Sequence, residues 1–190
     1  MSDQMQKPRV TEILKSCGFI DSRFFNEGAT SRGTAVHEAC HLHDLGQLDL
    51  ATLHPDLVGY LEAYKRFRAD FSVGEYEWQY EEMEQRKEDK FFNGTPDRVY
   101  VVAGLPPAQR GVIDIKTGGP LKWHPLQLAA YAELVGALPS LCRDLYLRDD
   151  GTYKLSEPIG MEDIHAWRAV LNYYHAKERY GIKSDDDRSA

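Results

Sequence analysis

The sequence contains little cysteine, no long apolar stretch and no excess of positive charge. Its three cysteines, Cys17, Cys40 and Cys142, are scattered and odd in number, which favours reduced thiols in a cytoplasmic protein over a disulfide framework. No apolar run approaches the roughly 20 residues of a membrane-spanning helix, and the polar N-terminus is not a signal peptide. These features argue against a disulfide-rich or membrane-embedded protein.

Net charge and length bound the class of protein further. A net charge of −7 gives no general indication of nucleic-acid binding, although a local basic groove can coexist with an acidic body. With 190 residues, 42% of them hydrophobic and 28% charged, the chain fits one globular domain with a sizeable core. We therefore expect a single domain over residues 1–190, with loose tails at about 1–8 and 183–190.

The most informative stretch spans residues 93–118 and predicts two strands joined by a turn. Residues 99–102 are β-branched or aromatic, and the run Gly104-Leu105-Pro106-Pro107 favours a turn after them. Residues 111–117 form a second short apolar run. Because side chains alternate faces along a strand, Val112, Asp114 and Lys116 should share one face, with Ile113 and Ile115 on the other.

Two carboxylates that converge with a lysine suit a hard metal ion. Asp97 starts the first strand and Asp114 lies in the second, so both would supply oxygen ligands of the kind that Mg²⁺ or Mn²⁺ prefers. A metal held there would acidify a bound water and offset the charge of a phosphate, and Lys116 would orient that water. The carbonyl of Ile115 is an extra candidate ligand. The alternative is an edge hairpin with a surface Asp–Lys pair, which contributes little to the stability of the fold.

The remaining chain alternates between helical and extended patterns. Residues 55–71 give the clearest helix, with apolar side chains at three- and four-residue steps. Residues 19–32 look irregular. The patterns predict helices at 10–17, 33–45, 55–71, 123–136 and 161–179, and further strands at 76–86, 141–149 and 153–155. The expected fold class is α/β, with a central mixed sheet of about four or five strands flanked by helices.

Several ordered pieces of residues 30–135 together resemble the PD-(D/E)xK nuclease superfamily, closest to its RecB-type and phage recombination exonuclease branch. Each piece is common by itself, and their order and spacing are much more specific. The pieces are Gly33-x-x-x-His37, an acid at Glu82, Gly94-Thr95-Pro96-Asp97, Asp114-Ile115-Lys116 and Gln127-x-x-x-Tyr131.

The resemblance implies a restriction-endonuclease-like core and a divalent-metal-dependent deoxyribonuclease. The implied activity is an exonuclease acting on DNA ends in recombination, repair or phage DNA metabolism. His37 and Glu82 would complete or support the metal site of Asp97 and Asp114, and Gln127 and Tyr131 would position Lys116 or the DNA backbone. Glu81 or Glu84 would fill this role instead if the strand register differs, because a slip of one residue moves every side chain to the other face.

Basic and aromatic residues supply candidate substrate contacts, and the resemblance implies the partners. Arg32, Arg98, Lys122 and Trp123 are candidate DNA-binding residues, with Trp123 suited to stack on an unpaired base. Solvated charges and ordinary packing are the alternative interpretation of all four. DNA is the expected partner, with a strand-annealing recombination protein and a homo-oligomer as further candidates. An iron–sulfur cluster, present in some relatives, is not expected, because it needs four cysteines.

Two other classes of function stay open from the sequence. His37-Glu38-Ala39-Cys40-His41 matches the zinc-peptidase motif, with Glu62 at roughly the distance of a third ligand. A nucleic-acid-binding protein that keeps the nuclease fold without turnover is the third hypothesis. The sequence leaves open exonuclease versus endonuclease action, polarity, strand preference, DNA versus RNA and the number of metal ions.

Overall fold

The structure is a computed structural model that describes residues 7–21, 27–71, 76–78, 87–89, 91–102 and 109–182. Its centre is a mixed sheet with the strand order β1-β4-β5-β6-β7. The strands are β1 (Tyr76–Trp78), β4 (Arg98–Val102), β5 (Arg110–Lys116), β6 (Cys142–Leu147) and β7 (Tyr153–Leu155). β5 and β6 run parallel, whereas the other neighbouring pairs are antiparallel. This arrangement confirms the predicted α/β class with a central mixed sheet.

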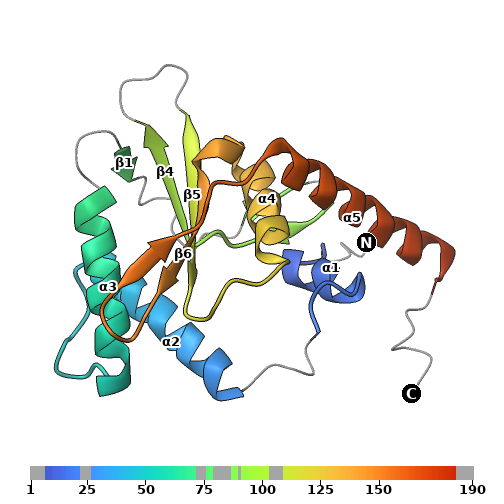
Figure 1. The fold of residues 1–190 in the computed structure, drawn as a ribbon. Coiled ribbons are helices and arrows are strands. Elements are labelled where there is room, and N and C mark those ends of the chain that lie inside the picture. The colour runs from blue at the N-terminus through green and yellow to red at the C-terminus, as the bar shows by residue number, and fades with distance from the viewer. Residues whose placement is uncertain are drawn as a thin grey trace, which may run out of the picture.

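Helices cover both faces of the sheet (Figure 1). α2 (Glu27–Asp44) and α3 (Pro55–Phe71) lie on one face, and α1 (Val10–Ser16), α4 (His124–Val135) and α5 (Met161–Tyr180) lie on the other. Each face has its own apolar cluster, one built around Trp167 of α5 and one around Phe67 of α3. No helix in the described part of the chain is both long and apolar enough to cross a membrane.

β5 has the alternation that the sequence predicts. Val112 is buried in the cluster beneath α4 and α5, and Ile113 and Ile115 are buried in the opposite cluster beneath α2 and α3. β5 also has a hydrogen-bonded neighbour on each side, so its Asp–Lys pair does not lie in an edge hairpin. A charged pair at the centre of a sheet, with helices on both faces, is withdrawn from solvent.

Local sequence signals locate most of the elements. α3 and β7 have the predicted bounds, and α1, α4, α5 and β6 differ from them by one or two residues. α4 begins next to Pro125 and ends at Gly136, whose φ of 65° suits glycine at a helix C-terminus. α2 begins at Glu27, so the expectation of an irregular segment over residues 19–32 is wrong for its last six residues. Extending a helix costs much less free energy than nucleating one. The mostly exposed first turns of α2 can therefore form as an extension of its buried part.

The segment before β4 departs from a continuous strand. β3 (Asn93–Gly94) pairs with β2 (Lys87–Glu88) in a separate small sheet, and β4 begins only at Arg98. Pro96 lies between them and has no N–H to donate to a strand partner. Asp97 therefore sits at the entrance of β4 with its side chain close to β5. Of the predicted strand over residues 76–86, residues 79–86 lie outside the described residues.

Lys7 and Pro8, at the end of the expected loose tail over about residues 1–8, are hydrogen-bonded to Asn93. The buried Asn93 donates its backbone N–H to the Pro8 carbonyl and its side-chain amide to the Lys7 carbonyl. Residues 1–6 and 183–190 lie outside the described residues.

Candidate active site

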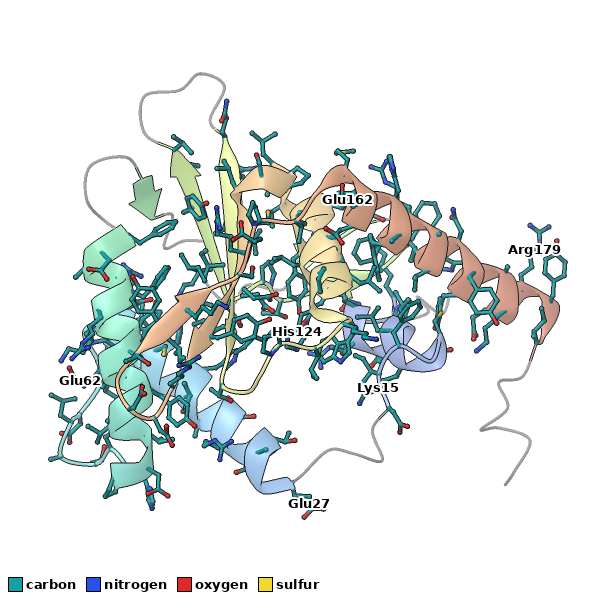
Figure 2. The ribbon with its side chains drawn as sticks, in the orientation of Figure 1. Lys15, Glu27, Glu62, His124, Glu162 and Arg179 are labelled. Atoms are coloured by element: carbon teal, nitrogen blue, oxygen red, sulfur yellow. The ribbon has the colours of Figure 1, made fainter. Side chains whose placement is uncertain are left out.

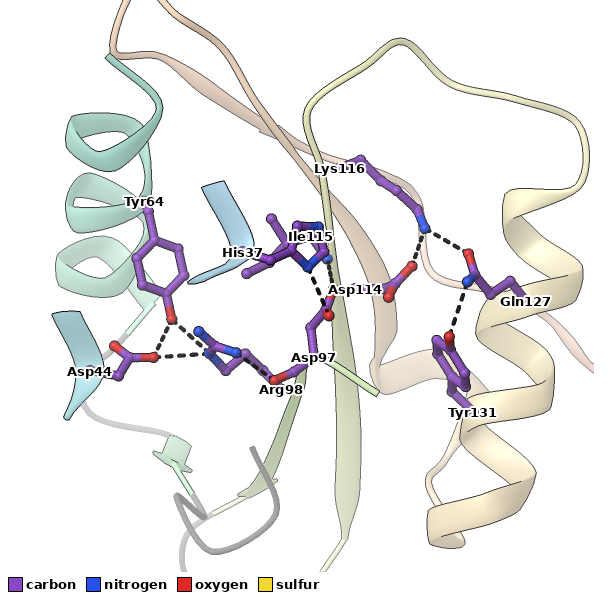
Figure 3. A network of polar contacts seen from close by, with 10 residues as sticks. All are labelled: His37, Asp44, Tyr64, Asp97, Arg98, Asp114, Ile115, Lys116, Gln127 and Tyr131. Carbon is purple, nitrogen blue, oxygen red and sulfur yellow. Dashed lines mark hydrogen bonds and ion pairs between the residues drawn. The ribbon is translucent and has the colours of Figure 1, made fainter. Parts of the chain in front are cut away.

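Asp97 lies where α2, β4 and β5 meet (Figure 3). One carboxylate oxygen, Oδ2, accepts a hydrogen bond of 2.6 Å from the Ile115 backbone N–H. The other, Oδ1, lies 3.0 Å from Nδ1 of His37 on α2. β5 and α2 thus hold the two oxygens from different sides, which fixes the carboxylate in one orientation.

His37 and Asp97 form an ion pair. The carboxylate of Asp97 raises the pKa of His37 to about 9, although burial opposes the change. Burial would raise the pKa of Asp97, but the charge and hydrogen bond of His37 and the Ile115 N–H hold it well below its usual range. The protonated Nδ1 of His37 therefore donates to an ionised Asp97 near neutral pH.

Lys116 is held by β5 and α4 together. Its Nζ contacts Asp114 Oδ2 and donates a hydrogen bond of 2.7 Å to Gln127 Oε1. Gln127 in turn donates through Nε2 to the Tyr131 hydroxyl at 3.0 Å. Gln127 and Tyr131 lie one turn apart on α4, and their chain fixes the position of the ammonium (Figure 3). The Trp123 ring lies 5.6 Å from the same Nζ, within range of a cation–π contact.

Among the buried aspartates of the site, Asp114 has the most strongly raised pKa. Burial raises its pKa to about 8, the nearby Asp97 and Asp144 add to the rise, and Lys116 opposes it. Burial alone would lower the pKa of Lys116, but the same acidic residues keep it above its usual value. The site therefore contains more buried acidic groups than cations to balance their charges, and a bound cation would favour the ionised form of Asp114.

The donor set fits the Mg²⁺ or Mn²⁺ that the sequence predicts. Asp97 and Asp114 offer carboxylate oxygens, and the carbonyl of Ile115 leaves β5 on the same side as the N–H that Asp97 binds. Among the described residues, no three His, Cys, Asp or Glu side chains are grouped closely enough to hold a metal by themselves. Mg²⁺ commonly keeps several waters beside one or two carboxylates, so a small protein ligand set suits it. His37 and Lys116 now contact the oxygens that a metal would take.

The zinc-peptidase arrangement finds little support in the geometry. His37 points its Nδ1 at Asp97, and Glu38 is exposed. Glu62 lies at the outer side of α3, where it pairs with Lys65 (Figure 2). The described residues thus do not bring His37, His41 and Glu62 together as three ligands of one metal.

The four candidate DNA contacts lie in different environments. Arg32 and Lys122 are exposed, with the Arg32 guanidinium 5.9 Å from the Tyr60 ring centroid, and Trp123 is half-buried beside Lys116. Arg98 is only 1% exposed, so a DNA backbone has no access to it. The prediction that Arg98 contacts the substrate is therefore wrong.

Arg98 instead joins β4 to the helices that cover it. Its Nε donates to Asp44 Oδ2 and to the Tyr64 hydroxyl, both at 2.9 Å, and its Nη1 donates to the Asp97 carbonyl at 2.6 Å. Arg68 completes the network at 2.9 Å from Asp44 Oδ1. The end of α2 and the middle of α3 thus fix the backbone of Asp97.

One acidic residue of the site was missed by the sequence reasoning, and another lies beyond the structure. Asp144 on β6 is paired in register with Asp114 and is 2% exposed. A signal was present in the sequence, since Asp144 is an acid inside the predicted strand over residues 141–149. Glu82 lies outside the described residues, as do Glu81 and Glu84, so the expected acid ahead of Asp97 stays a prediction.

The fold and site define a class of proteins: a mixed α/β domain with two buried aspartates and a lysine at the centre of its sheet. No family model matches the sequence, and no curated protein matches it. A structural comparison finds the crystal structure of LHK-Exo in complex with dAMP. The match has a TM-score of 0.50 and 15% sequence identity, and covers 93% of this chain and 89% of LHK-Exo. At this identity, the likeness concerns the fold.

Proposed function

We propose that the protein is a divalent-metal-dependent deoxyribonuclease that hydrolyses phosphodiester bonds from DNA ends. The observation that carries the proposal is the convergence of Asp97, Asp114 and Lys116, with the lysine fixed by Gln127. LHK-Exo, an exonuclease by its name, was crystallised with dAMP, which is the type of product released when one nucleotide is removed from a DNA end. Its likeness in fold supports a nuclease and makes an exonuclease the favoured form.

The chain's own residues would position the reactants. Asp97 and Asp114, with the Ile115 carbonyl, would hold Mg²⁺ or Mn²⁺, which supplies charge neutralisation at the phosphate and an acidified water. Lys116 would donate a hydrogen bond to the attacking water or to the non-bridging oxygens, where charge develops. Gln127 and Tyr131 restrict the lysine to one location, which lowers the entropy lost on reaching the transition state. The exposed Arg32 and Lys122 would contact the DNA backbone.

A nuclease assay with a matched lysine variant tests the proposal. Chelator-treated protein would receive end-labelled linear DNA or closed circular DNA, with Mg²⁺, Mn²⁺ or Zn²⁺. Lys116→Met removes the ammonium and keeps most of the side-chain length, and Lys65→Met removes a partly exposed lysine from α3 as the control. Release of mononucleotides from linear DNA by wild type and Lys65→Met, with at least a hundredfold loss in Lys116→Met, is expected.

Other results would change the assignment in defined ways. Cleavage of the circles would make the enzyme an endonuclease. Equal hydrolysis by Lys116→Met and wild type would refute the role of the lysine. Absence of hydrolysis by wild type with all three metals, together with DNA binding, would support the non-catalytic alternative and refute the nuclease.

A further inference from the structure

Asp144 faces the candidate site from the strand next to β5. β5 and β6 are parallel and pair Asp114 with Asp144 and Lys116 with Tyr146. Paired residues of parallel strands share a face of the sheet, as Val112 and its partner Cys142 do in the cluster beneath α4 and α5. The Asp144 carboxylate is therefore on the same face as Asp114 and Lys116.

The hydrogen bonds of Asp144 are incomplete. Its Oδ2 accepts one long hydrogen bond of 3.4 Å from the Tyr146 hydroxyl. Its Oδ1 is buried and has no hydrogen-bond partner among the described residues. A buried carboxylate oxygen without a donor costs free energy. Asp144 therefore has a carboxylate oxygen that can accept a further hydrogen bond.

A partner for that oxygen is present in the site. The Lys116 ammonium has three protons, and it now contacts Asp114 and Gln127. The charges of Asp114, Asp144 and Asp97 all act on Lys116. A metal that takes Asp114 would remove the carboxylate contact of Lys116, and Asp144 is the acid that lies next to Asp114 across the strand pair.

Space is available on the side of Asp144. Asp144 and Tyr146 line a cavity of about 730 Å³, whose wall also includes Thr117 and Gly118 of the loop that follows Lys116. Gly118 has open space around its α-carbon, so nothing packs tightly against that loop at this point. The cavity thus adjoins both Asp144 and the loop that follows Lys116 at the end of β5.

We propose that Asp144 is a positioning residue that receives the Lys116 ammonium when a divalent cation takes Asp114. This inference rests on the proposed metal-dependent function. In the metal-free protein, Lys116 neutralises Asp114. In the loaded protein, Lys116 stays in the site as a cation shared by Asp144 and Gln127, and Asp114 is released to the metal.

Metal binding to the apoprotein tests the proposal without relying on catalysis. Mn²⁺ would be titrated into chelator-treated protein, and free Mn²⁺ measured by electron paramagnetic resonance. Asp144→Asn keeps the size of the side chain and removes its charge, and Asp144→Glu restores the charge. Glu157→Gln, which removes an exposed acid from the wall of the same cavity, is the matched control.

The expected result is a specific coupling between Asp144 and Lys116. Asp144→Asn should raise the Kd for Mn²⁺ about tenfold or more, in the range found when a group that supports a metal ligand is removed. Asp144→Glu and Glu157→Gln should stay within threefold of wild type. In a Lys116→Met background no ammonium needs a new partner, so adding Asp144→Asn should change the Kd less than threefold.

Two outcomes would overturn the proposal. An unchanged Kd in Asp144→Asn would show that Asp144 does not assist metal binding. An equal rise in both backgrounds would show that Asp144 acts by its charge or as a ligand, independently of Lys116. If wild type and Asp144→Asn both hydrolyse DNA in Mg²⁺ while the Kd is unchanged, the proposed function would stand and only the role of Asp144 would fall.

Discussion

Replacing Arg98 with methionine should destabilise the protein strongly, although Arg98 is not expected to contact substrate. The guanidinium is 1% exposed and holds Asp44, Tyr64 and the Asp97 carbonyl. Methionine keeps the apolar volume of the side chain and removes the charge and its donors. In the wild type the Asp44 side chain is 3% exposed, and its second oxygen also pairs with Arg68, a contact that the substitution does not remove.

The size of the effect follows from this partial compensation. Removing one partner of a buried ion pair typically costs roughly 3–5 kcal/mol, because the other charge is left without a partner. Since Arg68 continues to pair with Asp44, we expect a loss near the lower limit, about 3 kcal/mol. For a chain of this length, such a loss corresponds to a fall in Tm of roughly 6–12 °C.

Urea unfolding at pH 7, followed by circular dichroism, would measure the loss in a double-mutant cycle. The cycle compares Arg98→Met, Asp44→Asn and the double variant, and a coupling of at least about 1 kcal/mol is expected because the two side chains touch. Arg68→Met should cost less, since Arg68 is 13% exposed. A loss below about 1 kcal/mol in Arg98→Met, or additive effects in the cycle, would refute the claim that this network holds Asp97.

Two further predictions concern packing and pH. Gly59→Ala should destabilise the protein by about 2 kcal/mol or more, because the new Cβ would lie 1.6 Å from the Asp149 backbone oxygen. The control Gly118→Ala should be tolerated, because its Cβ would meet nothing within 4 Å. Equal thermal unfolding curves for the two variants would contradict this prediction. Burial lowers the pKa of His124 to about 3, with Lys116 adding to the effect, so its contribution is complete above pH 6.5 and is lost as the pH falls from there. Between pH 7 and pH 5, the free energy of unfolding should therefore fall by up to about 2 kcal/mol more in wild type than in His124→Gln. Urea titrations that show equal falls in the two proteins would refute the assignment.

The fold was predictable where local signals and burial agree. The stripe of apolar residues on α3 gave its bounds, and the alternation along β5 gave the faces of Asp114 and Ile115, because one face of each element is buried. The start of α2 at Glu27 was not predictable in this way, since its Gly-, Ser- and Thr-containing sequence has weak helix propensity. That helix is set by its attachment to the buried part from Val36 onward.

The candidate site was predictable only in part, for a related reason. Its motifs identify Asp97, Asp114 and Lys116, but a residue gains a role from its neighbours across strands as well as along the chain. Asp144 lies 30 positions after Asp114 and meets it only through the parallel pairing of β5 and β6. Arg98 could have been corrected from sequence, because alternation puts it on the buried face of Tyr100.

The two halves of the site differ in how far apart their parts lie along the chain. Lys116, Gln127, Tyr131 and Asp144 belong to one continuous β5-α4-β6 unit, whereas Asp97 and His37 are separated by 60 positions. Short chain separations close with little entropy loss, and long ones need other contacts to be formed first. The lysine half of the site can therefore assemble with its own unit, while the Asp97 half exists only when α2 has docked. The complete site therefore forms only after α2 has packed against the sheet.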